Sequence, residues 1–160
     1  MATMTESRTI TGSLQEVWDV VCDMPSFPKF MEDIYRVKIQ EGSVESGRTV
    51  TQWIAMNEGA PMIWIEEDLF DGETHTIDYH MRSGDLEKLE GTWKLEAIPA
   101  LADVMPQTRV IMFLVYEFGV PELQDLIGDA MDVKVVKNCK MMLDGIEQRV
   151  AECRRVVIDS

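Results

Sequence analysis

Two acidic side chains at alternate positions of an apolar segment are the residues here with the clearest potential for chemistry. Glu66 and Asp68 follow Trp64 in the run Met62 to Leu69, which alternates as a β-strand does. If that face looks into a cavity, the two acids lie about 7 Å apart along the strand, and burial raises their pKa values into a range suited to acid/base work. A register shift by one residue would instead place them, with Glu67, on a solvated edge of an acidic protein. Both alternatives are open at this stage.

The two histidines do not form a catalytic pair. His75 and His80 are an odd number of positions apart in the run Thr74 to Arg82, so alternation sends them to opposite faces of one strand. We expect His80 on the outer face, and Tyr79 and Met81 on the face toward the cavity. A lone outward histidine is usually structural, and we expect that of His80.

Other patterns that carry chemistry do not occur in the sequence. It has no metal-ligating cluster, nucleophile elbow, phosphate-binding loop or dinucleotide fingerprint, so we expect no metal and no other cofactor. The three cysteines, Cys22, Cys139 and Cys153, lack metal-ligand spacing. We expect them to be reduced and structural.

Composition narrows the class of protein. The 160 residues are 46% hydrophobic and 28% charged, which predicts one globular domain over residues 1–160. The apolar runs are too short for a membrane span, and the N-terminal segment has no signal-peptide core, so we expect a cytoplasmic protein. The net charge of −14 opposes binding to nucleic acid.

The N-terminal third predicts one strand and two short helices. A weak alternation over residues 7–12 predicts the strand. Ser13 with Glu16 three residues later predicts a capping box and an amphipathic helix that ends near Asp23. The prolines that follow, Pro25 and Pro28, disfavour its continuation and predict a separate apolar second turn.

From Ile34 onward the apolar period changes to two. Glycine, proline and aspartate separate the alternating runs, which predicts antiparallel hairpins rather than strand–helix–strand units. The predicted strands begin at Ile34 and then cover residues 49–56, 62–69, 74–82, 86–96 and 109–118.

A helical stripe after Pro121 predicts one long amphipathic helix at the C-terminal end. Gly128 and Gly145 lower helix stability by about 1 kcal/mol each relative to alanine, so we expect close packing or bending there. The stripe consists of Ile127, Met131, Val135, Asn138, Met142, Ile146 and Val150.

This order of elements predicts an α+β helix-grip (START-like) fold. A curved antiparallel sheet of about seven strands would wrap round the long C-terminal helix, with two short helices after the first strand. Because one helix cannot fill the whole concavity of a bent sheet, such a fold leaves a ligand cavity between them.

Three segments carry a resemblance to a known family. The opening segment with Val17-Trp18 and Phe27-Pro28, the hairpin at Gly84-Asp85 that continues into residues 91–95, and the terminal helix with Asn138 look like the polyketide cyclase/dehydrase family. That family lies in the SRPBCC (START/birch-allergen-like) superfamily, and the resemblance covers roughly residues 7 to 150.

The resemblance implies an activity and part of a site. Aromatase/cyclases of this family hold a polyketone chain and guide an aldol closure followed by dehydration. By resemblance, Trp93 and Asn138 line the pocket and Phe27 lies at its mouth. Where characterised members offer an arginine and a serine inward, this sequence offers Glu66 and Asp68, which departs from the aromatase pattern.

Our leading hypothesis is a protein that binds a hydrophobic or aromatic polyketide-like molecule and acts as a cyclase/aromatase or dehydrase of a biosynthetic pathway. Glu66 or Asp68 would be its base or acid, and Asn138 would orient a carbonyl. The methionines of the cavity faces would adapt to an irregular apolar ligand. The expected ligand-binding residues are Phe27, Ile34, Trp64, Tyr79, Met81, Trp93, Met112, Leu114, Met131, Val135 and Met142.

Two further hypotheses need no catalysis. The first is a lipid or quinone carrier, or a protein that sequesters a natural product in self-resistance. The second is a protein-binding or homodimer face formed by Ile111, Phe113 and Val115 on the last strand. A shifted register of that strand would instead turn these residues inward.

Overall fold

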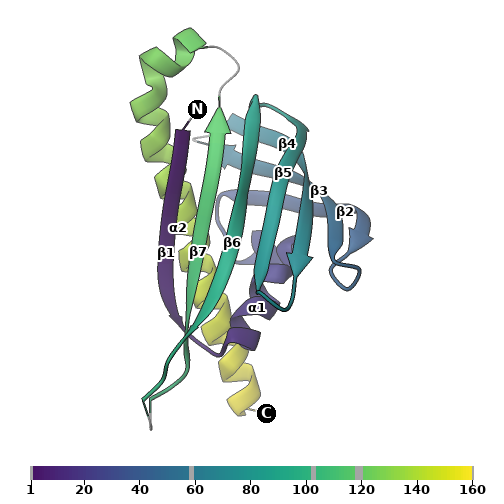
Figure 1. The fold of residues 1–160 in the computed structure, drawn as a ribbon, viewed down its shortest axis with the longest axis vertical. Coiled ribbons are helices and arrows are strands. Elements are labelled where there is room, and N and C mark those ends of the chain that lie inside the picture. The colour runs from purple at the N-terminus through teal and green to yellow at the C-terminus, as the bar shows by residue number, and fades with distance from the viewer. Residues whose placement is uncertain (1, 58–59, 102–103, 118–120, 160) are drawn as a thin grey trace.

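Seven antiparallel strands form one sheet in the order β1-β7-β6-β5-β4-β3-β2, and a long helix runs along it (Figure 1). The computed structural model describes residues 2–57, 60–101, 104–117 and 121–159. The strands are β1 (Ala2–Thr11), β2 (Ile34–Ser43), β3 (Arg48–Asn57), β4 (Ala60–Asp71), β5 (Thr76–Gly84), β6 (Lys88–Ile98) and β7 (Gln107–Glu117). The predicted helix-grip architecture is confirmed.

The first short helix begins at the predicted capping box. In α1 (Leu14–Cys22), the Ser13 hydroxyl accepts a hydrogen bond from the Glu16 N–H, and the Glu16 carboxylate accepts one from the Ser13 N–H, both at 3.1 Å. The 3-10 helix η1 (Met24–Lys29) follows, with Pro25 in its first turn and Phe27 fully buried. These two elements close one end of the curved sheet.

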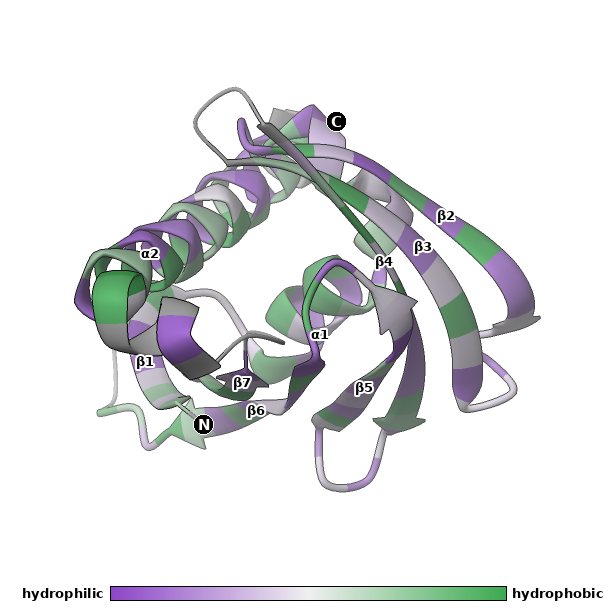
Figure 2. Ribbon diagram, turned by 90° about the horizontal axis from the view of Figure 1, so that it is seen from above, coloured by the Kyte–Doolittle hydropathy of each residue, from purple (hydrophilic) through white to green (hydrophobic). Residues whose placement is uncertain are grey.

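The helix α2 (Pro121–Asp159) lies across the concave side of the sheet, with α1 near its C-terminal end (Figures 1 and 2). A Cβ added to Gly145 would lie 2.6 Å from the backbone oxygen of Phe30, so the glycine permits the close packing that its position predicted. At the other edge, Arg8 of β1 forms an ion pair of 2.5 Å with Asp144 of α2. No described helix is both long enough and apolar enough to cross a membrane.

Side-chain alternation in β7 separates the interior from the outer face. Met112 and Leu114 are buried, whereas Phe113 between them is 41% exposed. The sequence therefore assigned the two faces of this strand correctly, and Ile111 and Val115 lie with Phe113 on the outer face.

Two local predictions were wrong. The first strand begins at Ala2 rather than Ser7, because pairing with β7 extends from Ala2 opposite Tyr116, and backbone pairing needs no apolar alternation. His75 lies in the turn before β5, at φ 55°, and not on the strand. Its ring packs edge-on against Trp18, at 5.2 Å between centroids. His80 is exposed on the outer face, as predicted.

Candidate functional site

A cavity of about 130 Å³ lies between the concave face of the sheet and α2. Its wall is apolar and aromatic except for one carboxyl and one amide side chain. The lining residues are Trp53, Trp64, Glu66, Tyr79, Leu89, Trp93, Met112, Leu114, Val135, Asn138, Cys139 and Met142.

The structure brings most of the predicted site residues together in this wall. The strands contribute Glu66, Trp64, Tyr79, Trp93, Met112 and Leu114, and α2 contributes Val135, Asn138 and Met142. Residues four apart on a helix share a face, which places Asn138 and Met142 over the same part of the sheet. Whether these side chains contact a ligand stays a prediction.

Other predicted residues do not line the cavity. Phe27 is fully buried one layer behind it, 5.9 Å from Trp53 between ring centroids, and is not at its mouth. Ile34 is buried on β2, beyond the cavity wall. Met81 and Met131 are half-buried and lie outside the wall, because the inward face of a strand or helix extends past the cavity.

Three lining residues were missed: Trp53, Leu89 and Cys139. Alternation in β3 could have indicated Trp53, and Leu89 lies on the same face of β6 as Trp93. Cys139 had a weaker signal, since it flanks the predicted apolar stripe of α2 by one position.

The two carboxyl groups on β4 point to the interior. Glu66 is 4% exposed and Asp68 is fully buried, so the alternative of a solvated edge is excluded. Glu66 lines the cavity, and Trp64 donates its indole N–H to Glu66 Oε1 at 2.7 Å. Asp68 lies behind the wall, so a ligand in the cavity would meet Glu66 first.

Asp68 is held by hydroxyl groups of the neighbouring strand β3. Its Oδ2 accepts hydrogen bonds from Thr51 at 2.7 Å and from Thr49 at 3.0 Å. Thr51 in turn accepts a hydrogen bond of 2.9 Å from the indole N–H of Trp53. The register that pairs Thr49 with Asp68 therefore builds a buried polar network directly behind the cavity.

Burial raises the pKa of Glu66 well above its ordinary value. The hydrogen bond to Asp68 and the charge of Asp68 add to this rise, while the hydrogen bond from Trp64 opposes it. Burial and the nearby Glu66 likewise raise the pKa of Tyr79, and burial raises that of Cys139 to about 12. The phenol and the thiol in the wall are therefore neutral near pH 7.

Aromatic surfaces form much of the wall. The rings of Trp53 and Trp64 stack with their centroids 5.5 Å apart and their planes within 9°. Trp93 and Tyr79, both buried, complete the aromatic part of the wall. Such flat faces favour an aromatic or otherwise planar ligand.

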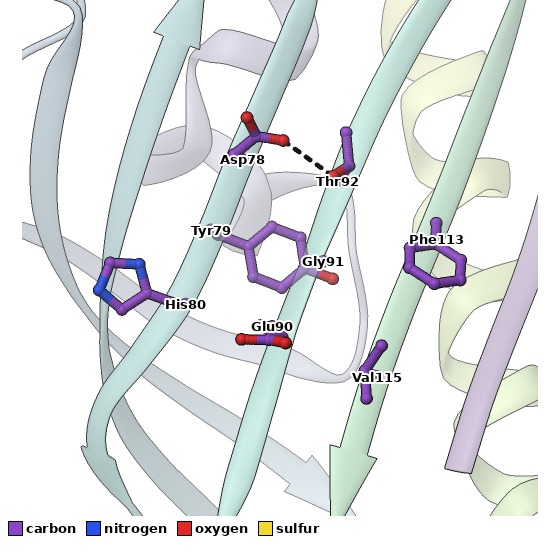
Figure 3. A pocket seen from close by; sticks show the side chains of 8 residues that line it. All are labelled: Asp78, Tyr79, His80, Glu90, Gly91, Thr92, Phe113 and Val115. Atoms are coloured by element: carbon purple, nitrogen blue, oxygen red, sulfur yellow. Dashed lines mark hydrogen bonds between the residues drawn. The ribbon is translucent and has the colours of Figure 1, made fainter. Parts of the chain in front are cut away.

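A larger hollow of about 330 Å³ lies on the outer face of the sheet, across β5, β6 and β7 (Figure 3). Asp78 there accepts a hydrogen bond of 2.8 Å from Thr92, and His80 and Phe113 lie at its sides. This hollow is a shallow, exposed surface, and both of its carboxylates are already paired, Asp78 with Thr92 and Glu90 with Lys88 at 3.3 Å. The smaller interior cavity, with a buried carboxyl in its wall, is the better candidate site. Among the described residues, no group of three or more potential metal ligands occurs.

Comparisons with known proteins agree with this architecture. A family model described as polyketide cyclase / dehydrase and lipid transport matches residues 10–140. TTHA0849 from Thermus thermophilus superposes with a TM-score of 0.82 at 24% identity, over 95% of this chain and 99% of that one. The Zhui aromatase/cyclase from Streptomyces sp. R1128 superposes with a TM-score of 0.78 at 17% identity, over 97% and 95%.

A START superfamily protein from Mycobacterium smegmatis superposes with a TM-score of 0.73 at 15% identity, over 94% of this chain and 98% of that one. No curated protein sequence matches the chain. At these identities the solved structures establish a shared fold, whereas the family match over residues 10–140 establishes membership of a family.

Proposed function

The chain belongs to the polyketide cyclase/dehydrase and lipid-transport family of hydrophobic-ligand-binding proteins, and from that membership we propose that it binds a small aromatic or polyketide-like molecule and catalyses proton transfer on it. The observation that carries the proposal is the buried Glu66 carboxyl in an aromatic wall, backed by Asp68. A carboxyl with a raised pKa in an apolar site is suited to general acid/base catalysis near neutral pH.

The two carboxyl groups would work as one proton-accepting unit. Holding one proton between them, they can take a second from the carbon beside a ketone of the substrate. The C–H bond breaks, an O–H bond forms on Glu66, and the electron pair moves into an enolate. The Asn138 amide, also in the wall, can donate a hydrogen bond to the enolate oxygen.

Ring closure and dehydration then follow without a further cofactor. The enolate carbon attacks a second carbonyl of the same molecule, and a C–C bond forms while that carbonyl becomes an alkoxide. The carboxyl pair returns its proton to the alkoxide, which becomes a hydroxyl group. Glu66 then removes a second proton from the attacking carbon and the pair delivers it to that hydroxyl group, which leaves as water while the C=C bond forms. Glu66 and Asn138 touch the substrate in this scheme, whereas Asp68 is a positioning residue that can accept the shared proton when Glu66 takes one from the substrate.

A single-ring ketone tests the proton transfer directly. We expect the protein to accelerate exchange of the α-protons of cyclohexanone in D2O, followed by NMR, above the rate in buffer. Glu66→Gln should return the rate to that of buffer, because an amide cannot accept the proton. Glu67→Gln, on the opposite face of the same strand, should leave it unchanged. Equal rates for the wild type and Glu66→Gln would contradict the proposal.

A poly-β-ketone substrate tests the ring closure. Product mass should fall by one water for each closure and dehydration, and the loss should depend on Glu66. Substrate recovered unchanged, together with exchange in cyclohexanone, would restrict the activity to proton transfer.

Carriage without catalysis is the second candidate function. The cavity of about 130 Å³ favours carriage over ring closure. An apolar cavity of about 150 Å³ holds a molecule the size of benzene, whereas ring closure needs a longer chain in the site. Native mass spectrometry of the purified protein distinguishes the two functions. A bound, chemically unchanged small molecule supports carriage, and turnover of an added substrate supports catalysis.

A further inference from the structure

The protons and charges of the carboxyl pair follow from its hydrogen-bond partners. Asp68 Oδ1 is buried and receives no hydrogen bond from an N–H or hydroxyl group among the described residues. The carboxyl group within its reach is that of Glu66. Two buried carboxyl groups repel each other when both are ionised, and the raised pKa of Glu66 favours a proton on the pair.

The partners of the two carboxyl groups determine whether Glu66 donates or accepts a hydrogen bond toward the cavity. Asp68 Oδ2 already accepts hydrogen bonds from Thr49 and Thr51, which hold this carboxyl group behind the cavity wall. The raised pKa of Glu66 favours its protonated form, whose O–H can reach the buried Asp68 Oδ1 behind the wall. Glu66 Oε1 accepts from Trp64 and has a second lone pair free for a ligand. Toward the cavity, Glu66 is an acceptor.

No basic side chain in the rest of the described wall offsets the negative charge of the carboxyl pair. None of the described lining residues is basic, and Asn138 is the wall's one other strongly polar side chain. The faces of Trp53, Trp64 and Trp93 carry negative quadrupole potential, which attracts cations and repels anions. Charge, hydrogen-bond capacity and aromatic surface thus favour the same kind of ligand.

We propose that this cavity selects a single-ring ligand that carries a hydrogen-bond donor, a hydroxyl or a protonated amine, and rejects carboxylates. This inference rests on the proposed binding function and names the ligand class of the same site. The ring occupies the cavity of about 130 Å³ against the tryptophans, and the donor reaches Glu66. For a ligand that tautomerises, the site favours the enol, whose hydroxyl supplies that donor.

Calorimetric titration with four single-ring probes tests the selection: toluene, phenol, benzylamine and benzoate, all at pH 7. We expect phenol and benzylamine to bind at least about tenfold more tightly than toluene, as one hydrogen bond to a buried carboxyl provides. Benzoate should show no binding. Phenol no tighter than toluene, or benzoate as tight as phenol, would overturn the inference.

Two variants of Glu66 assign the selection to this side chain. Glu66→Leu should reduce the preference for phenol over toluene to about one, because the acceptor is lost. Glu66→Gln keeps the side-chain shape and an acceptor oxygen and mimics the protonated form, so the preference for phenol over toluene should persist in this variant. Glu67→Gln, on the outer face, should retain the wild-type order of affinities. Wild-type selectivity in Glu66→Leu would overturn the assignment.

The same titration distinguishes a failure of ligand selection from a failure of the proposed binding function. If toluene binds and no probe is preferred, the cavity binds ligands but the selection fails. If none of the four probes binds, the proposed binding function fails and the selection fails with it.

Discussion

Trp64 donates its indole N–H to Glu66 Oε1 at 2.7 Å, from two positions earlier on the same face of β4. The hydrogen bond orients the carboxyl group at the cavity wall and partly opposes the rise in its pKa. Burial is the larger effect, so the net shift is upward. One aromatic residue therefore lines the cavity and also fixes the acid that a ligand would meet.

The raised pKa of Glu66 predicts how stability depends on pH. The folded protein keeps a proton that the unfolded chain releases near its ordinary value of about 4.3. The stabilisation from this residue is therefore complete below about pH 4.3 and is lost as the pH rises through the folded pKa. Glu66→Gln mimics the protonated form, so its stability relative to the wild type should increase as pH rises, measured by urea unfolding across pH.

The groups around Glu66 allow the pH dependence to be assigned to this residue. Asp68, Trp64 and Tyr79 face it, and the pKa of Tyr79 is itself raised well above its ordinary value, so Tyr79 does not titrate in this range. Glu67→Gln is the matched control with the opposite sign. Arg48 and Arg82 lower the pKa of Glu67, so its contribution is present above about pH 4.3 and lost in acid. The same pH trend in both variants would refute the assignment.

The hydroxyl groups behind the cavity should contribute measurably to stability. Thr51→Val keeps the side-chain shape but leaves the buried indole N–H of Trp53 without a partner and Asp68 Oδ2 with the hydrogen bond from Thr49 alone. We expect a loss of about 1–3 kcal/mol in the free energy of unfolding, measured by urea denaturation. Thr92→Val removes a similar bond, to Asp78, on the exposed face and should lose less. A larger loss for Thr92→Val would contradict the view that burial sets the effect.

Periodicity was sufficient to predict the layers of this fold. Alternation sorted Met112 from Phe113, and the capping box located the start of α1. Alternation could not decide the register of Glu66 and Asp68, because acidic residues occur both at solvated edges and at buried sites. That decision needed the pairing of β4 with β3, a contact between segments distant in the sequence.

The extent of the cavity was beyond sequence reasoning for a related reason. Phe27 and Ile34 are as buried as the lining residues, yet they fill the core below the cavity rather than bounding it. Which inward residues border empty space depends on the curvature of the sheet and on the distance of α2 from it. Neither quantity is encoded in the local pattern of any one segment.

The close approach of Tyr79 to β6 predicts a strong effect at Gly91. A Cβ at this position would lie 2.1 Å from the backbone oxygen of Phe113 and 2.6 Å from the Tyr79 hydroxyl oxygen. Gly91→Ala must therefore shift a strand and the tyrosine of the cavity wall. We expect a loss of about 1–3 kcal/mol in the free energy of unfolding, measured by urea denaturation. Gly72→Ala, where a Cβ meets nothing within 4 Å, should change stability by less than about 0.5 kcal/mol.

Occupying the cavity from the helix side should abolish ligand binding while the fold persists. Val135 of α2 lines the cavity, and the phenylalanine ring of Val135→Phe can enter the empty space against the tryptophans. We expect the affinity for phenol to fall at least about tenfold, because the added ring occupies the space of the ligand. The apolar contacts that the ligand then loses are worth more than about 1.4 kcal/mol of binding free energy. Calorimetric titration measures the affinity, and thermal unfolding confirms that the variant is folded.

Val133→Phe provides the matched control for the same helix. Val133 is 68% exposed, so the added ring projects into solvent and should leave both affinity and stability close to those of the wild type. Because both variants add the same atoms two residues apart, any difference between them reports the cavity rather than helix propensity. If Val135→Phe is folded and binds phenol as the wild type does, the ligand lies elsewhere, and the outer hollow beside His80 becomes the site to test.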